Sequence, residues 1–85
     1  MKETEVTIRL DTIKKVKDFV ETTSKYDEEI TIKSHRYEIN AKSIMGIFSL
    51  NLLESVIVCL YSDDKNIQDS FIKEIEKFKE EKYEI

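Results

Sequence analysis

The stretch Ala41-Lys42-Ser43-Ile44-Met45-Gly46-Ile47-Phe48-Ser49-Leu50 contains the only glycine of this 85-residue chain. Ile44, Ile47 and Phe48 fall at i, i+3 and i+4, which places them on one face of a short helix. Ser43 precedes this apolar run and is the predicted N-cap, because a serine oxygen accepts a hydrogen bond from a first-turn N–H group. The pattern by itself fits a capped helix packed on a core, although the positive end of a helix dipole also favours a negative group there.

The residues before this stretch alternate first and then repeat with helical spacing. Apolar and polar residues alternate over Glu3–Leu10, which predicts a half-buried strand. Asp11 or Thr12 is the expected cap of the following helix, which ends within Ser24-Lys25-Tyr26-Asp27. The core-facing side predicted for this helix consists of Ile13, Val16, Phe19, Val20 and Thr23.

Two further strands and a central strand are predicted next. Glu29–Lys33 and Tyr37–Asn40 each alternate, and the polar Ser34-His35-Arg36 between them indicates a hairpin. Val56–Tyr61 is an unbroken apolar run rich in β-branched residues, which indicates a strand in the middle of a sheet.

The last part of the chain is predicted to be an amphipathic helix reaching about Glu80, with Ser62-Asp63-Asp64 as its turn and cap and Lys82–Ile85 frayed. Its apolar face consists of Ile67, Phe71, Ile75 and Phe78. The order β-α-β-β-α-β-α predicts an α+β fold, with a four-stranded antiparallel sheet and three helices on one face, in a single domain of residues 1–85.

Composition excludes several classes of function. A net charge of −4 argues against nucleic acid as a direct partner. No apolar run approaches the roughly 18 residues of a transmembrane helix, and the N-terminus lacks the apolar core of a signal peptide, so membrane insertion is not expected. The single Cys59 fits a reducing cytoplasm and is interpreted as a small core residue rather than a reactive thiol.

Two motifs carry a resemblance to a known family. Ser24-Lys25-Tyr26-Asp27, followed at this distance by Lys42-Ser43-Ile44-Met45-Gly46, closely resembles HPr, the histidine phosphocarrier of the bacterial sugar phosphotransferase system. The resemblance covers nearly the whole chain. It implies the HPr-like open-faced β-sandwich and a cytoplasmic protein that is not an enzyme and uses no cofactor. It also implies that Ser43 corresponds to the serine that Gram-positive members carry as a regulatory phosphorylation site.

The segment responsible for the family's chemistry differs in this chain. HPr carries phosphate on the histidine of a Gly-x-His-Ala-Arg-Pro-type segment between the first strand and the first helix, because the ring nitrogen is nucleophilic near neutral pH. The corresponding stretch, Leu10–Val16, contains no histidine, arginine, proline or glycine. Asp11, Thr12 and Lys14 therefore belong to a degenerate active-centre loop.

The alignment of this loop depends on which face of the first strand is buried. An ungapped count from the second motif puts Thr12 at the place of the histidine and Lys14 at that of the arginine. It also turns three polar side chains inward, those of Glu3, Glu5 and Thr7. Burying the apolar set instead (Val6, Ile8 and Leu10) requires a loop shorter than the family's by an odd number, about three residues, since a one-residue slip exchanges the faces of a strand. Neither Thr12 nor Lys14 is therefore assigned the family's role.

The only histidine, His35, lies in the predicted hairpin turn, which in the HPr-like fold is remote from the phosphorylation loop. It is interpreted as a polar turn residue, and a functional role for it is the less favoured alternative. No second histidine or cysteine cluster exists to build a zinc site. The acidic pairs Glu28-Glu29 and Asp63-Asp64 are interpreted as solvated turns and caps rather than catalytic dyads.

The favoured function is that of an HPr-like regulatory protein, similar to the catabolite-repression paralogue that lacks the histidine, keeps the serine and acts through a transcriptional regulator. Ser43 would be its phosphorylation site, and an HPr serine kinase and such a regulator its protein partners. Its expected docking surface comprises Lys42, Ile44, Met45, Gly46 and Phe48, although Met45 and Phe48 equally fit partly buried positions. The alternatives are a phosphocarrier that uses His35 or another nucleophile, and an HPr-fold domain with an unrelated binding role. A monomer or weak dimer is expected.

Overall fold

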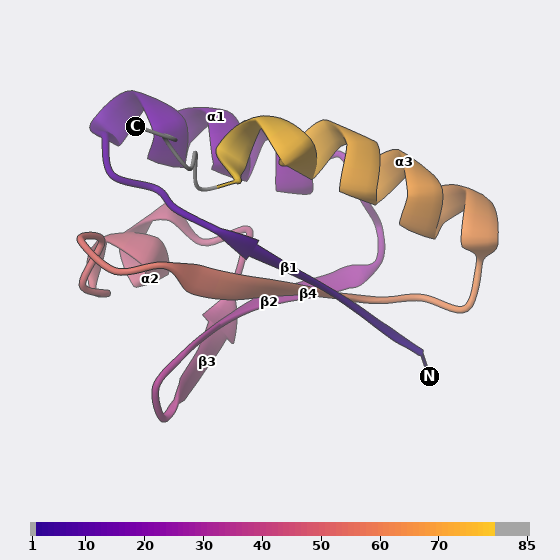
Figure 1. Cartoon of the computed structure of the whole chain (residues 1–85), viewed down its shortest axis with the longest axis horizontal. Helices are drawn as coiled ribbons and strands as arrows, with labels where there is room; N and C mark the ends of the chain where they lie inside the picture. Colours follow the sequence, from indigo (N-terminus) through magenta and orange to yellow (C-terminus); the bar gives the residue numbers. More distant parts are fainter. Residues whose placement is uncertain (1, 80–85) are drawn as a thin grey trace, which may run out of the picture.

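The computed structural model describes residues 2–79, in which four strands form one antiparallel sheet of order β1-β4-β2-β3. In chain order the elements are β1 (Glu3–Ile8), α1 (Ile13–Thr23), β2 (Glu29–Ser34), β3 (Tyr37–Asn40), α2 (Ile44–Phe48), β4 (Val56–Tyr61), α3 (Lys65–Ile75) and the 3-10 helix η1 (Glu76–Phe78). The helices α1 and α3 lie over one face of the sheet, and α2 packs beside α1 and β3 (Figure 1). The open-faced α+β sandwich with the order β-α-β-β-α-β-α is therefore confirmed.

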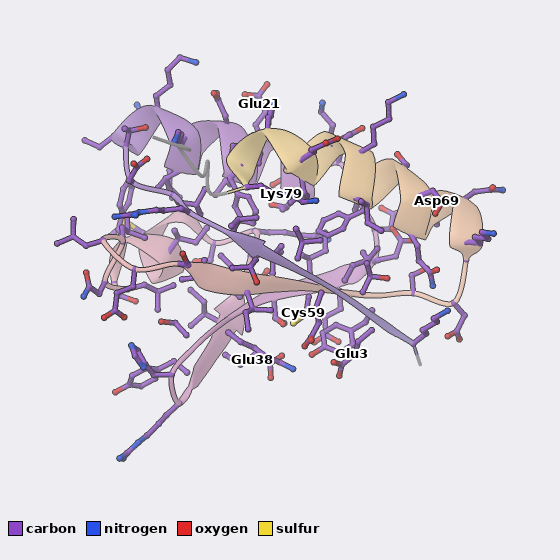
Figure 2. All side chains as sticks on the ribbon, in the orientation of Figure 1. Glu3, Glu21, Glu38, Cys59, Asp69 and Lys79 are labelled. Carbon is purple, nitrogen blue, oxygen red and sulfur yellow. The ribbon has the colours of Figure 1, made fainter. Side chains whose placement is uncertain are left out.

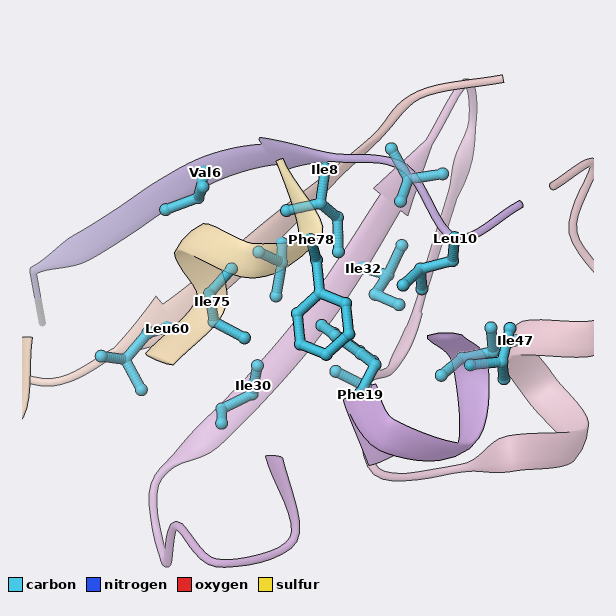
Figure 3. Packing of buried hydrophobic residues seen from close by; sticks show 14 of the residues in the cluster. Val6, Ile8, Leu10, Phe19, Ile30, Ile32, Ile47, Leu60, Ile75 and Phe78 are labelled. Carbon is cyan, nitrogen blue, oxygen red and sulfur yellow. The ribbon is translucent and has the colours of Figure 1, made fainter. Parts of the chain in front are cut away.

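The hydrophobic core lies between the sheet and the helices, because alternate strand residues point to that side. Figure 3 shows Phe19 of α1 and Phe78 of η1 next to each other in the middle of the core. Their rings pack edge-on, with 5.5 Å between the ring centroids. A second edge-on pair, Tyr26 and Phe71, lies 5.6 Å apart. The other fully buried core members include Ile8, Leu10, Ile30, Ile32, Ile47, Val58, Leu60 and Ile75.

The predicted central strand is confirmed. The strand β4 pairs with β1 on one side and with β2 on the other, so that Val58 lies opposite both Val6 and Ile32. Its bounds and those of β3 are the predicted ones.

Three other boundaries differ from the prediction. The strand β1 ends at Ile8 rather than Leu10, although Leu10 is still buried. The strand β2 continues to Ser34, which leaves a hairpin turn of only two residues. The first of these, His35, takes the left-handed backbone with φ 53°, since a tight hairpin needs positive φ and the turn contains no glycine. The α-helix α3 ends at Ile75, and the residue predicted to end it, Glu80, lies outside the described residues together with Lys82–Ile85.

The prediction that Ile13 faces the core is wrong. Thr12 caps α1, so Ile13 is its first helical residue, and its side chain is 66 % exposed. The buried side of the helix begins one turn later, at Val16, and continues through Phe19. Helical spacing correctly placed Val16 and Phe19 on one side of the helix, but the first turn of the helix extends beyond the part of the core that covers this side.

The interpretation of Cys59 needs a correction. Its side chain is fully buried, but it lies on the sheet face opposite the helices, outside the hydrophobic core. Polar side chains cover it there, and Sγ lies 3.6 Å from Oε2 of Glu5. Burial raises the pKa of the Cys59 thiol to about 11, against the opposing effect of the Lys33 charge. The thiol is thus protonated near neutral pH, as the non-reactive interpretation requires.

Candidate functional site

The loop between β1 and α1 uses its polar side chains to begin the helix. The Thr12 hydroxyl accepts a hydrogen bond from the backbone N–H of Lys15 at 3.1 Å. Lys15 also reaches back to Asp11, with Nζ 3.0 Å from Oδ1, and this hydrogen bond lowers the pKa of the Asp11 carboxyl. Lys14 forms an i,i+4 ion pair with Asp18 at 3.1 Å. Of the three residues predicted to form the degenerate loop, Thr12 therefore caps α1, and Asp11 and Lys14 each pair with an oppositely charged side chain of that helix.

The strand that precedes this loop has the expected orientation. Val6, Ile8 and Leu10 are buried against the helices, and Glu3, Glu5 and Thr7 are exposed on the other face. The ungapped alignment of Leu10–Val16 with the histidine segment would reverse these two faces, so it is incompatible with the structure. The shortening of the loop that follows from this orientation stays a prediction.

The only histidine of the sequence is far along the chain from this loop and belongs to the β2–β3 turn. The tip of that hairpin projects below the sheet, whereas α1 lies above it (Figure 1). His35 Nε2 lies 2.6 Å from Oε2 of Glu54, and both side chains are exposed. This contact ties the hairpin tip to the loop before β4, which is a structural use of the ring.

Ser43 occupies the predicted N-cap position of α2. Its hydroxyl accepts a hydrogen bond from the Gly46 backbone N–H at 3.2 Å, and its side chain is partly exposed. The backbone of Gly46 is not left-handed, so the lack of a side chain matters here for the space it leaves rather than for the backbone conformation. A Cβ at position 46 would lie 3.3 Å from the Ser43 Oγ atom. Glycine therefore keeps the surroundings of the serine oxygen open.

The apolar residues of α2 divide between the core and the surface. Ile47 is buried and Ile44 is partly buried against the core. Met45 is 76 % exposed and Phe48 is 40 % exposed, and we call these two the α2 surface. The first turn of α1, which begins at the exposed Ile13, lies at the same end of the molecule as α2 (Figure 1). Sequence reasoning missed Ile13 as a surface residue because its spacing matched the core side of α1.

Lys42 connects the two motifs on which the resemblance rests. Its Nζ donates hydrogen bonds to the backbone carbonyls of Tyr26 and of Glu28, the latter at 2.8 Å. A neighbouring bond, from the Thr23 hydroxyl to the Ala41 carbonyl at 2.9 Å, holds the same two segments together. The Lys42 ammonium is thus engaged with the α1–β2 connection and joins the two motifs in the fold.

The comparison with family models matches residues 2–81 to the model described as "PTS HPr component phosphorylation site". The chain belongs to the HPr family. The solved structure of HPr-C-His from Thermoanaerobacter tengcongensis is 30 % identical, with a TM-score of 0.68 over 88 % of this chain and 90 % of that one. A phosphocarrier protein HPr from Bacillus anthracis is 18 % identical, with a TM-score of 0.63 over 85 % and 94 %, and shows the same fold.

HPr proteins are phosphocarriers rather than catalysts, and they interact with other proteins of the phosphotransferase system. Within residues 2–79 no group of three or more histidine, cysteine or acidic side chains is arranged to hold a metal ion. In the same range no helix combines the length and apolar character needed to cross a bilayer.

Proposed function

We propose that this chain is a regulatory HPr-family protein of the cytoplasm that does not relay phosphate through the family's active-centre histidine. It acts instead through Ser43 and a protein-docking surface around α2. The observation that carries the proposal is the loop Leu10–Val16, which contains no histidine and whose polar side chains serve α1. The Thr12 hydroxyl accepts the capping hydrogen bond, and the neighbouring carboxylate that could act as its base, Asp11, is paired with Lys15.

A phosphate on Ser43 fits the local backbone. Its oxygens would replace the hydroxyl as acceptors for the N–H groups of the first turn, among them that of Gly46. The helix α2 has five residues, so its dipole contributes little and these N–H groups supply most of the stabilisation. Lys42 would stabilise the phosphate less than its place next to Ser43 suggests, because its ammonium is bonded to the backbone carbonyls of Tyr26 and Glu28.

The same modification would change the character of the α2 surface. Ile44–Phe48 contains no charged side chain, so Met45 and Phe48 present a neutral, apolar surface in the unmodified protein. A phosphoserine adds a charge of about −1.5 to −2 beside them. A partner with a complementary basic group would then bind more tightly, and a partner with a purely apolar or acidic one more weakly. A kinase and a transcriptional regulator are the partners we infer.

Phosphorylation of Ser43 by an HPr serine kinase is the experiment that tests the proposal. Wild type and Ser49→Ala should be labelled by the kinase and ATP, and Ser43→Ala should not. Ser49 is the matched control because it is exposed at the other end of α2 and its hydroxyl bonds to the Gly46 carbonyl. Loss of the Ser43 cap costs only about 1 kcal/mol, so the variant should stay folded. Equal labelling of Ser43→Ala and wild type, or of none of the three, would reject the proposal.

Substitution of Met45 by Asp should weaken binding of the same kinase by about tenfold or more, as is typical of an exposed apolar anchor. The free energy of unfolding should change by less than about 1 kcal/mol, because the side chain is 76 % exposed. Ile72→Asp is the control, since Ile72 is an exposed apolar residue on α3. Titration calorimetry and urea unfolding measure the two quantities. Unfolding of Met45→Asp, or equal loss of binding in both variants, would contradict the docking surface.

A further inference from the structure

The sheet face opposite the helices is uncovered along its whole length in the described part of the chain. Figure 2 shows Glu3, Glu38 and Cys59 on this side, away from the helices that carry Glu21 and Asp69. Strand alternation and register place on it Glu3, Glu5 and Thr7 of β1, Ile57, Cys59 and Tyr61 of β4, Glu29, Thr31 and Lys33 of β2, and Glu38 and Asn40 of β3. We call this set the open face. It carries four carboxylates and a single cation.

The charges on the open face do not cancel. The cation, Lys33, is shared between two carboxylates, with its Nζ 3.6 Å from Oε2 of both Glu3 and Glu5. On the β3 side, Oε2 of Glu38 accepts hydrogen bonds of 2.7 Å from the hydroxyls of Tyr61 and Thr31. These bonds lower the pKa of Glu38, so they orient a charged carboxylate without neutralising it. The face is thus anionic overall, and Lys33, its one cation, lies between Glu3 and Glu5 of β1 and the opposite residue Glu38 of β3.

A hollow of about 450 Å³ lies at the edge of the sheet, beside the beginning of β2 and the end of β3 at Asn40, and Ile30 and Ile39 line it together with residues of the open face. Four acidic residues are among those that line it, namely Asp27, Glu28, Glu29 and Glu38. The cation at its wall is Lys42, whose ammonium is already bonded to backbone carbonyls. Because Glu29 and Glu38 belong to both the hollow and the open face, the two form one continuous acidic surface.

We propose that the open face is a second docking surface, which binds an extended basic segment of a partner protein and receives one of its arginine side chains in the hollow. Charge complementarity selects this occupant. A guanidinium donates several N–H groups in a planar fork, which suits the carboxylates of Glu29 and Glu38. A second copy of this chain would bring the same negative charge to the contact. The open face lies opposite α1 and α3, and the proposal uses neither Ser43 nor the α2 surface, although Lys42 beside Ser43 lines the hollow.

The test is a nuclear magnetic resonance titration of the whole ¹⁵N-labelled chain with the acetylated, amidated peptide Gly-Arg-Gly-Arg-Gly. Chemical-shift changes should concentrate on the backbone N–H groups of Glu29, Thr31 and Glu38. The same peptide with citrulline in place of arginine, which keeps the shape and removes the charge, should cause none of them. Glu29→Gln with Glu38→Gln should weaken binding by about fivefold, the combined effect of two exposed ion pairs.

The matched control is Glu21→Gln with Glu76→Gln, which removes the same charge from exposed positions on α1 and η1. It should change the affinity by less than twofold. Equal weakening in both double variants would mean general electrostatic attraction and would overturn the proposal, as would binding of the citrulline peptide or no binding at all. Shifts on the open face that grow with protein concentration alone would identify a second copy as the occupant and equally refute it. If the double variant does not fold, Glu29→Gln alone decides by the same comparison.

Discussion

Incubated with phosphoenolpyruvate and the first enzyme of the phosphotransferase system, this protein should gain no phosphoryl group. The family's acceptor is a histidine after the first strand, and here Leu10–Val16 contains none. Thr12 in that loop is bonded to the Lys15 backbone, and Asp11 is paired with the Lys15 side chain. Neither group combines the nucleophilicity and the freedom that an in-line phosphoryl transfer requires.

Intact mass measured at alkaline pH, where phosphohistidine survives, should show no addition of about 80 Da, the mass of one phosphoryl group. An HPr that carries the histidine is the positive control, and His35→Gln is the informative variant. An acid-labile adduct on wild type that disappears in His35→Gln would establish the alternative of a carrier with a non-standard site. We expect wild type and His35→Gln to be equally unlabelled, because His35 lies at the hairpin tip in contact with Glu54.

Truncation of Phe19 to alanine should lower the free energy of unfolding by about 3–5 kcal/mol, the range for a large buried aromatic side chain. Phe19 is fully buried at the centre of the core and packs edge-on against Phe78. A domain of this size has only about 5–10 kcal/mol in total, so the variant should be barely stable at room temperature. Urea unfolding followed by circular dichroism measures the change.

Ile13→Ala is the matched control from the same helix. Because Ile13 is exposed, its truncation should change the free energy of unfolding by less than about 0.5 kcal/mol. Phe19→Leu, which largely conserves volume, should lie between the two at about 1.5 kcal/mol or less. A large loss for Ile13→Ala together with a small one for Phe19→Ala would mean that α1 presents a different side to the sheet.

Those features that depend on contacts between near neighbours in the chain could be predicted from the sequence. The serine before an apolar run predicted the N-cap at Ser43, whose hydrogen bond spans three residues. The alternation of Val6, Ile8 and Leu10 predicted the buried side of β1, and with it the failure of the ungapped loop alignment. The resemblance of the two motifs to HPr predicted the fold, which the family match and the solved relatives confirm.

The candidate site could be predicted only in part. Ser43 and the absence of histidine from Leu10–Val16 are visible in the sequence, and so is the apolar character of Met45. The role of Lys42 is not, because its partners are backbone carbonyls of Tyr26 and Glu28, which a side-chain pattern does not encode. The exposure of Ile13 is not visible in the sequence either. Helical periodicity identifies the residues that share one side of a helix, but it does not show how far along the helix that side is covered by the core.

The sequence by itself determined which residues form strands and helices and which side chains share a face, because these follow from periods of 2 and 3.6 residues along the chain. Only the tertiary structure decided what covers each face. Both sides of β4 are rich in apolar residues, yet Val58 and Leu60 are packed under the helices, whereas Cys59 lies beneath charged side chains on the open face. The face of β4 that is buried is the one on which α1 and α3 pack, and this packing depends on contacts between residues distant in the chain. The acidic open face itself arises in the same way, since only strand pairing brings Glu3, Glu29 and Glu38 onto one surface.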